Sequence, residues 1–68
     1  MTDPKKTWEW ALGDLAHGRR SAKCVRAFDQ LTNDMLRTDR ISMDEFITAQ
    51  TVIGAAYAGA AQLARIAA

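Results

Sequence analysis

The feature that most constrains this chain is a long apolar helix pattern in its last third. Apolar residues there recur at alternating steps of three and four, which places them on one stripe of a helix, at Phe46, Ala49, Ile53, Ala56, Ala60, Leu63 and Ala67. The rows beside this stripe are also rich in apolar residues, so the predicted helix is hydrophobic around more than half of its circumference. One small partner surface is too narrow to cover such a helix.

Two shorter helices are predicted before it. Asp3 followed by Pro4 is typical of a helix start, and an apolar face follows over residues 4–17, made of Trp8, Ala11, Leu12 and Leu15. We expect Gly18 to end this helix in the left-handed conformation. Ser21 is a suitable N-cap for a second helix over 22–38, whose predicted inward stripe is Cys24, Val25, Phe28, Leu31 and Met35.

The start of the third helix is the best marked boundary in the chain. Ser42 and Glu45 have the spacing of a capping box, and Ile41 before the cap is placed to pack on Phe46. The third helix is therefore predicted over 43–67. No strand pattern or internal repeat is present, and the connections are short. We predict one all-α domain over residues 1–68, a hairpin of the second and third helices with the first laid across it.

The length of the third helix predicts a second copy. At 1.5 Å per residue it spans about 36 Å, whereas a compact chain of this size has a diameter near ~28 Å. Its C-terminal half should project, with Ile53, Tyr57, Leu63 and Ile66 exposed. We therefore predict a homodimer with two-fold symmetry. The predicted dimer interface consists of Ile53, Ala56, Tyr57, Ala60, Leu63 and Ile66.

The residues that carry chemistry are few. The only cysteine, Cys24, and the only histidine, His17, exclude an internal disulfide and a thiolate-rich zinc site. We expect Cys24 to be a small core residue and His17 to interact with the end of its helix. No phosphate-binding loop, metalloprotease motif or serine elbow is present. The sequence thus predicts no enzyme, no catalytic residues, no metal and no cofactor.

One short segment resembles a known calcium-binding family. The run from Arg40 to Phe46 is similar to the end of an EF-hand loop, with an apolar residue at the eighth position and Glu45 at the twelfth. The entry half departs from that pattern, because Leu36 stands where an oxygen ligand is needed and Asp39 stands where the loop has glycine. The capping box accounts for Ser42 and Glu45, so no calcium site is predicted.

Charge and aromatic residues suggest contact surfaces. The net charge is +1 at pH 7, but the basic residues Arg19, Arg20, Lys23 and Arg26 cluster around the start of the second helix. Trp8 and Trp10 diverge by roughly 200° on a helix, so one is buried and the other exposed. Trp10 lies off the apolar face. We predict a partner-binding surface at Trp10, Arg19, Arg20, Lys23 and Arg26.

These patterns predict a non-catalytic interaction module. We expect it to self-associate and to inhibit or modulate a larger host protein, as is typical of small accessory factors of phages and mobile elements. The alternative is a small dimeric DNA-binding regulator that uses the basic start of the second helix. Gln62 and Arg65 interrupt the apolar run, which lacks the ~20 clean residues of a membrane span. With no signal sequence pattern, we expect a cytoplasmic protein without a membrane partner.

Overall fold

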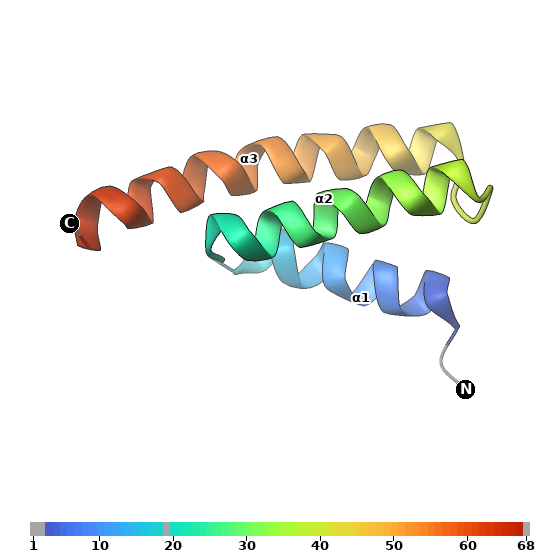
Figure 1. Ribbon diagram of the computed structural model, residues 1–68, viewed down its shortest axis with the longest axis horizontal. Coiled ribbons are helices and arrows are strands. Elements are labelled where there is room, and N and C mark those ends of the chain that lie inside the picture. Colours follow the sequence, from blue (N-terminus) through green and yellow to red (C-terminus); the bar gives the residue numbers. More distant parts are fainter. Residues whose placement is uncertain (1–2, 19, 68) are drawn as a thin grey trace.

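The chain folds into three α-helices, in agreement with the predicted all-α class (Figure 1). The computed structural model describes residues 3–18 and 20–67, and the side chain of Ala67 lies outside the described part. Helix α1 spans Pro4–His17, α2 spans Ala22–Arg37 and α3 spans Met43–Ala67. Within the described residues there is no strand. The second helix ends at Arg37, one residue before the predicted boundary, with Thr38 as its C-cap.

Each helix begins where a side chain accepts a hydrogen bond from the first turn. The carboxylate of Asp3 accepts from the backbone N–H of Lys5 at 3.1 Å, and the hydroxyl of Ser21 accepts from the N–H of Cys24 at 3.3 Å. At the start of α3, the Ser42 hydroxyl accepts from the Glu45 N–H at 3.2 Å, and the Glu45 carboxylate accepts from the Ser42 N–H at 3.0 Å. This reciprocal pair confirms the predicted capping box.

The capping box makes stability depend on pH. The backbone N–H of Ser42, together with nearby Lys5, lowers the pKa of Glu45 below its ordinary value of 4.5. A carboxyl group with a lowered folded-state pKa stabilises the fold above its ordinary pKa, and this contribution is lost as pH falls through the lower value. We expect the urea midpoint, followed by circular dichroism, to fall between about pH 5 and about pH 3. The urea midpoint of the Glu45→Gln variant should fall less over this pH range. Equal falls for the variant and the original protein would show that Glu45 is not the group responsible.

The left-handed cap lies at the end of α2 and not at the end of α1. Gly18 is extended, with φ −118° and ψ 157°, so its predicted left-handed conformation is wrong. Its N–H bonds the carbonyl of Asp14, and a Cβ added there would lie 3.2 Å from that oxygen. Asp39 instead has φ 61°. The N–H groups of Asp39 and Arg40 bond the carbonyls of Leu36 and Met35, which is the Schellman pattern.

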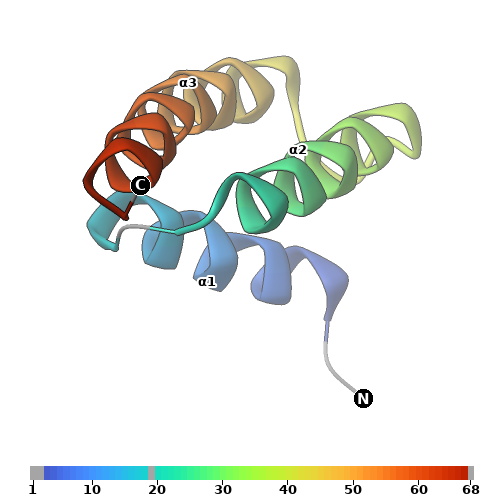
Figure 2. The same cartoon turned by 60° about the vertical axis from the view of Figure 1, so that its left-hand side comes forward.

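Helices α2 and α3 run side by side as a hairpin, and α1 packs against both of them (Figures 1 and 2). The Lys5 ammonium lies 3.3 Å from the Glu45 carboxylate, so the beginnings of α1 and α3 lie at the same end of the molecule. One core fills the space between the three helices. Its buried residues are Trp8, Leu15, Val25, Phe28, Met35, Ile41, Ala49 and Ile53.

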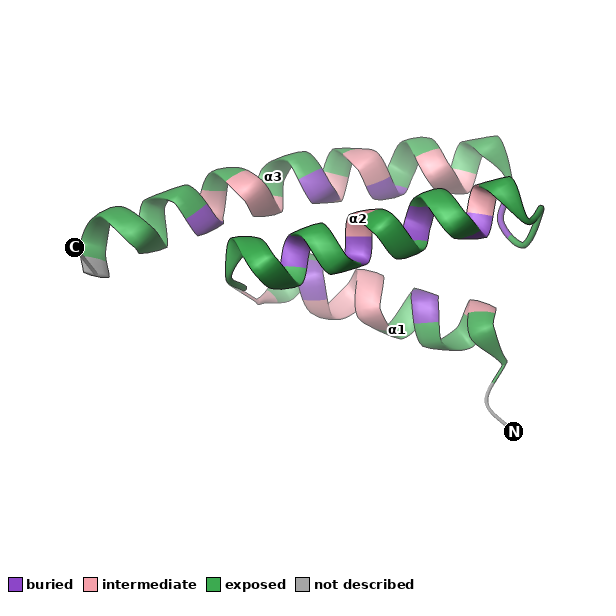
Figure 3. Cartoon of the chain, viewed as in Figure 1, coloured by how far each residue is buried: buried purple, intermediate pink, exposed green. Residues whose placement is uncertain are grey.

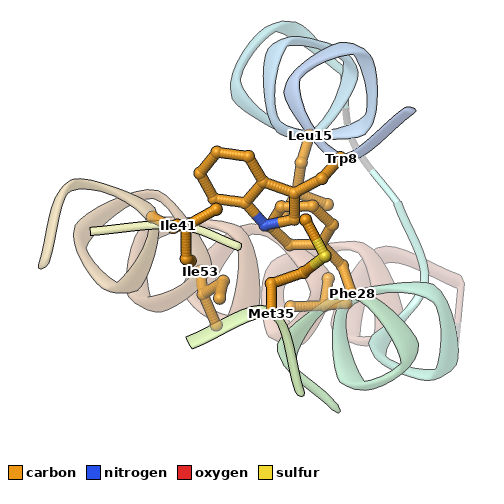
Figure 4. Close-up of a cluster of buried hydrophobic side chains, with 8 residues drawn as sticks. Trp8, Leu15, Phe28, Met35, Ile41 and Ile53 are labelled. Atoms are coloured by element: carbon orange, nitrogen blue, oxygen red, sulfur yellow. The ribbon is translucent and has the colours of Figure 1, made fainter. Parts of the chain in front are cut away.

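Trp8 lies at the centre of this core and is hydrogen-bonded there (Figure 4). Its indole is 2% exposed and stacks on Phe28, with the ring centroids 6.2 Å apart. The indole Nε1–H donates to the hydroxyl of Thr32 at 3.0 Å, and that hydroxyl donates to the Phe28 carbonyl at 2.8 Å. Both buried donors therefore have acceptors, which removes the cost of burying them.

The inward stripe of α2 differs from the predicted one at two positions. Val25, Phe28, Thr32 and Met35 are buried, whereas Cys24 is exposed and Leu31 is 38% exposed. The predictions of a core role for Cys24 and an inward position for Leu31 are therefore wrong. Thr32 replaces Leu31 in the stripe because the buried indole of Trp8 needs an acceptor at that point. A ranking of residues by hydrophobicity alone favours leucine there.

Helix α3 is longer than the part of the bundle that covers it (Figure 3). The molecule is 39 Å long in its longest dimension. The last buried residue of the helix is Ala60, and residues 61–66 are all exposed. The predicted exposure is confirmed for Leu63 and Ile66 and is wrong for Ile53, which is buried. Tyr57, also predicted to be exposed, is half-buried against the core. Helices α1 and α2 cover more of α3 than the length comparison predicted.

Candidate interaction surface

The side of α3 that faces away from the bundle is uncharged over most of its length. We call this surface the outer face of α3; its exposed residues are Met43, Ile47, Thr51, Gly54, Ala55, Ala58, Ala61 and Gln62. Thr51 and Ala55 lie at its edge and also line a hollow beside α1. Met43 is 58% exposed and Ile47 is 56% exposed. No charged side chain occurs between Phe46 and Ala64. The solvent side of an amphipathic helix normally carries charged residues, so this face is not a typical solvated surface.

The charges of α3 lie at its two ends. Asp44 and Glu45 are in the first turn and Arg65 is in the last turn. Asp44 and Arg65 are exposed, whereas Glu45 is held by Ser42 and Lys5. The exposed acid and the exposed base of the helix therefore flank the outer face. Each sign also opposes the helix dipole at its end, which stabilises α3.

The predicted dimer interface is divided by the fold. Ile53 is 2% exposed and Ala60 is 6% exposed, so these two residues already pack within their own chain. Ala56 and Tyr57 are half-buried against the core cluster. Leu63 at 39% and Ile66 at 75% are accessible. The interface stays a prediction. Within one chain, however, Ile53 and Ala60 are already buried, and Ala56 and Tyr57 are already partly covered.

Two hollows lie along the seam between α1 and α3. One, of about 290 Å³, is lined mainly by small or apolar residues: Leu15, Ala16, Gly18, Thr51, Val52, Ala55, Ala56 and Gly59. The other, also about 290 Å³, is lined by Trp8, Glu9, Leu12, Asp44, Glu45 and Thr48. Thr51 is the only lining residue of the first hollow with a polar side chain, so its walls offer no acid, base or thiol. Within the described residues, no group of three or more His, Cys, Asp and Glu side chains is arranged to hold a metal ion.

The predicted basic cluster is only partly free. The Arg20 guanidinium donates to both carboxylate oxygens of Asp14, at 3.0 and 2.6 Å. This bidentate bond lowers the pKa of Asp14 and raises that of Arg20. Lys23 and Arg26 are exposed and take part in none of the ion pairs found among the described residues. Arg19 lies outside the described residues.

The two tryptophans separate as predicted. Trp8 is buried, and Trp10 is 72% exposed on the opposite side of α1. Its exposure fits a contact surface, because tryptophan is enriched among residues that dominate protein interfaces. Trp10 lies in the middle of α1, whereas Arg20, which the prediction grouped with it, bonds Asp14 near the C-terminal end of that helix. The structure does not show Trp10 and the basic cluster as one site.

The two candidate reactive side chains do not form a pair among the hydrogen bonds of the described residues. His17 Nδ1 lies 2.8 Å from the Gly13 carbonyl in its own helix. Cys24 is exposed at the start of α2. The dimer interface predicted from the sequence does not include the outer face of α3, whose large apolar members are Met43 and Ile47. The signal that could have indicated this face is the charge-free run from Phe46 to Ala64.

Over the described residues, the fold and these surfaces define an all-α protein of three helices, the third of which has an exposed face without charged side chains from Phe46 to Ala64. When the chain is compared with models of known protein families, with curated proteins and with solved structures, none of them matches it. In the part of the chain that the structure describes, none of the helices has both the length and the apolar character needed to cross a bilayer.

Proposed function

We propose that this protein is a non-catalytic helical interaction module that self-associates through α3. The observation that supports this most strongly is the outer face of α3, which is exposed and carries no charge from Phe46 to Ala64. The face also exposes the large apolar side chains Met43 and Ile47, and exposed apolar patches are typical of protein contact sites. The exposed Leu63 and Ile66 add apolar surface to the same helix near its C-terminal end.

The proposal includes a second partner, a larger host protein in the cytoplasm whose activity the module inhibits or modulates. The exposed Trp10 supports a contact that self-association through α3 does not use, because it lies on α1. The absence of a phosphate-binding loop, metalloprotease motif or serine elbow from the sequence suits an accessory factor of the phage or mobile-element type better than an enzyme.

Self-association is tested by measuring mass against concentration. We expect light scattering after gel filtration to give about twice the chain mass of 7.5 kDa at tens of micromolar, and the mass to fall on dilution. A mass of one chain at every concentration up to about 100 µM would contradict the proposal. Trp10→Ala is the control. Because α1 is not part of the proposed contact, the mass of this variant should be that of a dimer at the same concentrations.

A DNA-binding regulator is the second candidate. Exposed Lys23 and Arg26 at the start of α2 favour it, since helix N-termini and basic side chains bind phosphate. The engagement of Arg20 by Asp14 reduces the charge available there. A mobility-shift titration separates the two candidates: a DNA-binding protein should give a salt-dependent shift that is lost in the Lys23→Ala/Arg26→Ala variant.

A further inference from the structure

We propose that the second copy packs antiparallel on the outer face of α3, with Asp44 of each protomer opposite Arg65 of the other. This inference rests on the self-association proposed above and specifies its geometry. Three observations support it: the position of the charges on α3, the open space at Gly54, and the burial of the stripe that the sequence alone had assigned to the dimer.

The charges determine the direction in which the partner's α3 runs. Asp44 and Arg65 are 21 positions apart, or about 32 Å along the helix. A parallel pair places each of them beside the same residue of the partner, so like charges face each other at both ends. An antiparallel pair places opposite charges together at both ends at once. Because the face between them is uncharged, these end charges decide the orientation.

The same charges select the register. If Asp44 lies opposite the partner's Arg65, the two-fold axis passes between Gly54 and Ala55. Thr51 then lies opposite the partner's Ala58, and Ile47 lies opposite the partner's Gln62. All four of these residues are exposed on the outer face. The register therefore buries Ile47 and leaves the bundle as it is, because none of the paired residues belongs to the core.

The centre of this contact permits a close approach. A Cβ added at Gly54 would meet no atom within 4 Å, so packing within the chain does not account for the glycine. A glycine inside a helix costs about 1 kcal/mol relative to alanine. With Gly54, Ala55 and Ala58 at the crossing, the helix axes can approach to about 8 Å. A crossing angle near about 20° keeps the charged ends of the two helices within reach of each other.

Charge exchange tests the pairing. Asp44→Lys and Arg65→Glu should each weaken dimerisation about tenfold, because each turns both symmetric ion pairs into repulsions. The double variant Asp44→Lys/Arg65→Glu should restore the dissociation constant to within about threefold of the original value. Arg26→Glu on α2 is the control and should leave the dissociation constant of the dimer unchanged. Sedimentation measures the constants, and circular dichroism checks that each variant is helical. Additive weakening in the double variant would overturn the pairing.

Cysteine cross-linking tests the register without changing a charge. In a Cys24→Ser background, Thr51→Cys and Ala58→Cys chains are mixed, allowed to exchange subunits and oxidised. We expect a disulfide between the two variants and none within either variant alone. Like residues are offset by about 10 Å along the axes in this register, whereas a disulfide requires Cα atoms within about 7 Å.

The outcomes separate this inference from the proposal on which it rests. Cross-linking of each variant with itself would show a parallel pair and overturn the inference. A dimer mass with no cross-link in any mixture would place the contact on another face, which overturns the inference and leaves self-association intact. A single-chain mass at every concentration would overturn both.

Discussion

Replacing Trp8 with alanine is expected to lower the free energy of unfolding by about 3–5 kcal/mol. The indole is 2% exposed, stacks on Phe28 and donates its Nε1–H to Thr32. Its removal leaves a large cavity at the point where all three helices meet. A chain of this length holds only about 3–10 kcal/mol in total, so much of the Trp8→Ala population should be unfolded at room temperature.

Urea unfolding followed by far-ultraviolet circular dichroism measures this loss. Trp10→Ala is the matched control, because Trp10 is 72% exposed and its truncation should change stability by less than about 0.5 kcal/mol. The loss of stability in Trp8→Phe should lie between those of Trp8→Ala and Trp10→Ala, since phenylalanine keeps an aromatic ring and removes the donor to Thr32. All variants are compared at one protein concentration, because self-association adds to apparent stability. Equal losses for Trp8→Ala and Trp10→Ala would show that the indole is not central to the core.

Replacing Ile53 with alanine is expected to cost about 2–5 kcal/mol. Ile53 is 2% exposed and belongs to the buried cluster between α3 and the other two helices. Ile66 on the same helix is 75% exposed, so Ile66→Ala is the matched control and should change monomer stability by less than about 0.5 kcal/mol. The two variants remove the same atoms from one helix, and only the burial differs.

This pair also tests which stripe of α3 a second copy uses. If Ile53 packs within its own chain, Ile53→Ala should shift the urea midpoint even at concentrations too low for self-association. If Ile53 instead lies between protomers, its truncation should weaken dimerisation and leave the dilute protein unchanged. The second result would restore the interface predicted from the sequence.

The helix starts and most of the helix ends were predictable because the signals are local. Asp3, Ser21 and Ser42 each bond the backbone of the turn that follows, and such bonds depend on residues two or three positions away. The left-handed cap was less predictable. Glycine is the usual residue for that conformation, yet Asp39 adopts it and Gly18 does not. Gly18 is extended, and Arg20 beyond it bonds Asp14 of the helix that Gly18 ends.

The sequence predicted the core residues that are buried because they are hydrophobic. It did not predict the one that is buried because of a hydrogen bond, Thr32. Trp8, Val25, Phe28 and Met35 are buried as expected. Thr32 is fully buried because it accepts from an indole 24 positions away in the chain, and no local pattern records that distant partner. Cys24 is exposed because α3 and α1 approach α2 on the side of Val25, one residue further along the helix.

The sequence by itself determined three helices, their starts, and a third helix with more apolar surface than a short chain can cover. These follow from residue spacing and capping, which act over a few positions. Only the tertiary structure decided which part of that surface remains uncovered. Helices α1 and α2 cover the stripe that contains Phe46 and Ile53 and leave the outer face of α3, most of whose residues are small or polar, because burying the larger side chains removes more apolar area from water.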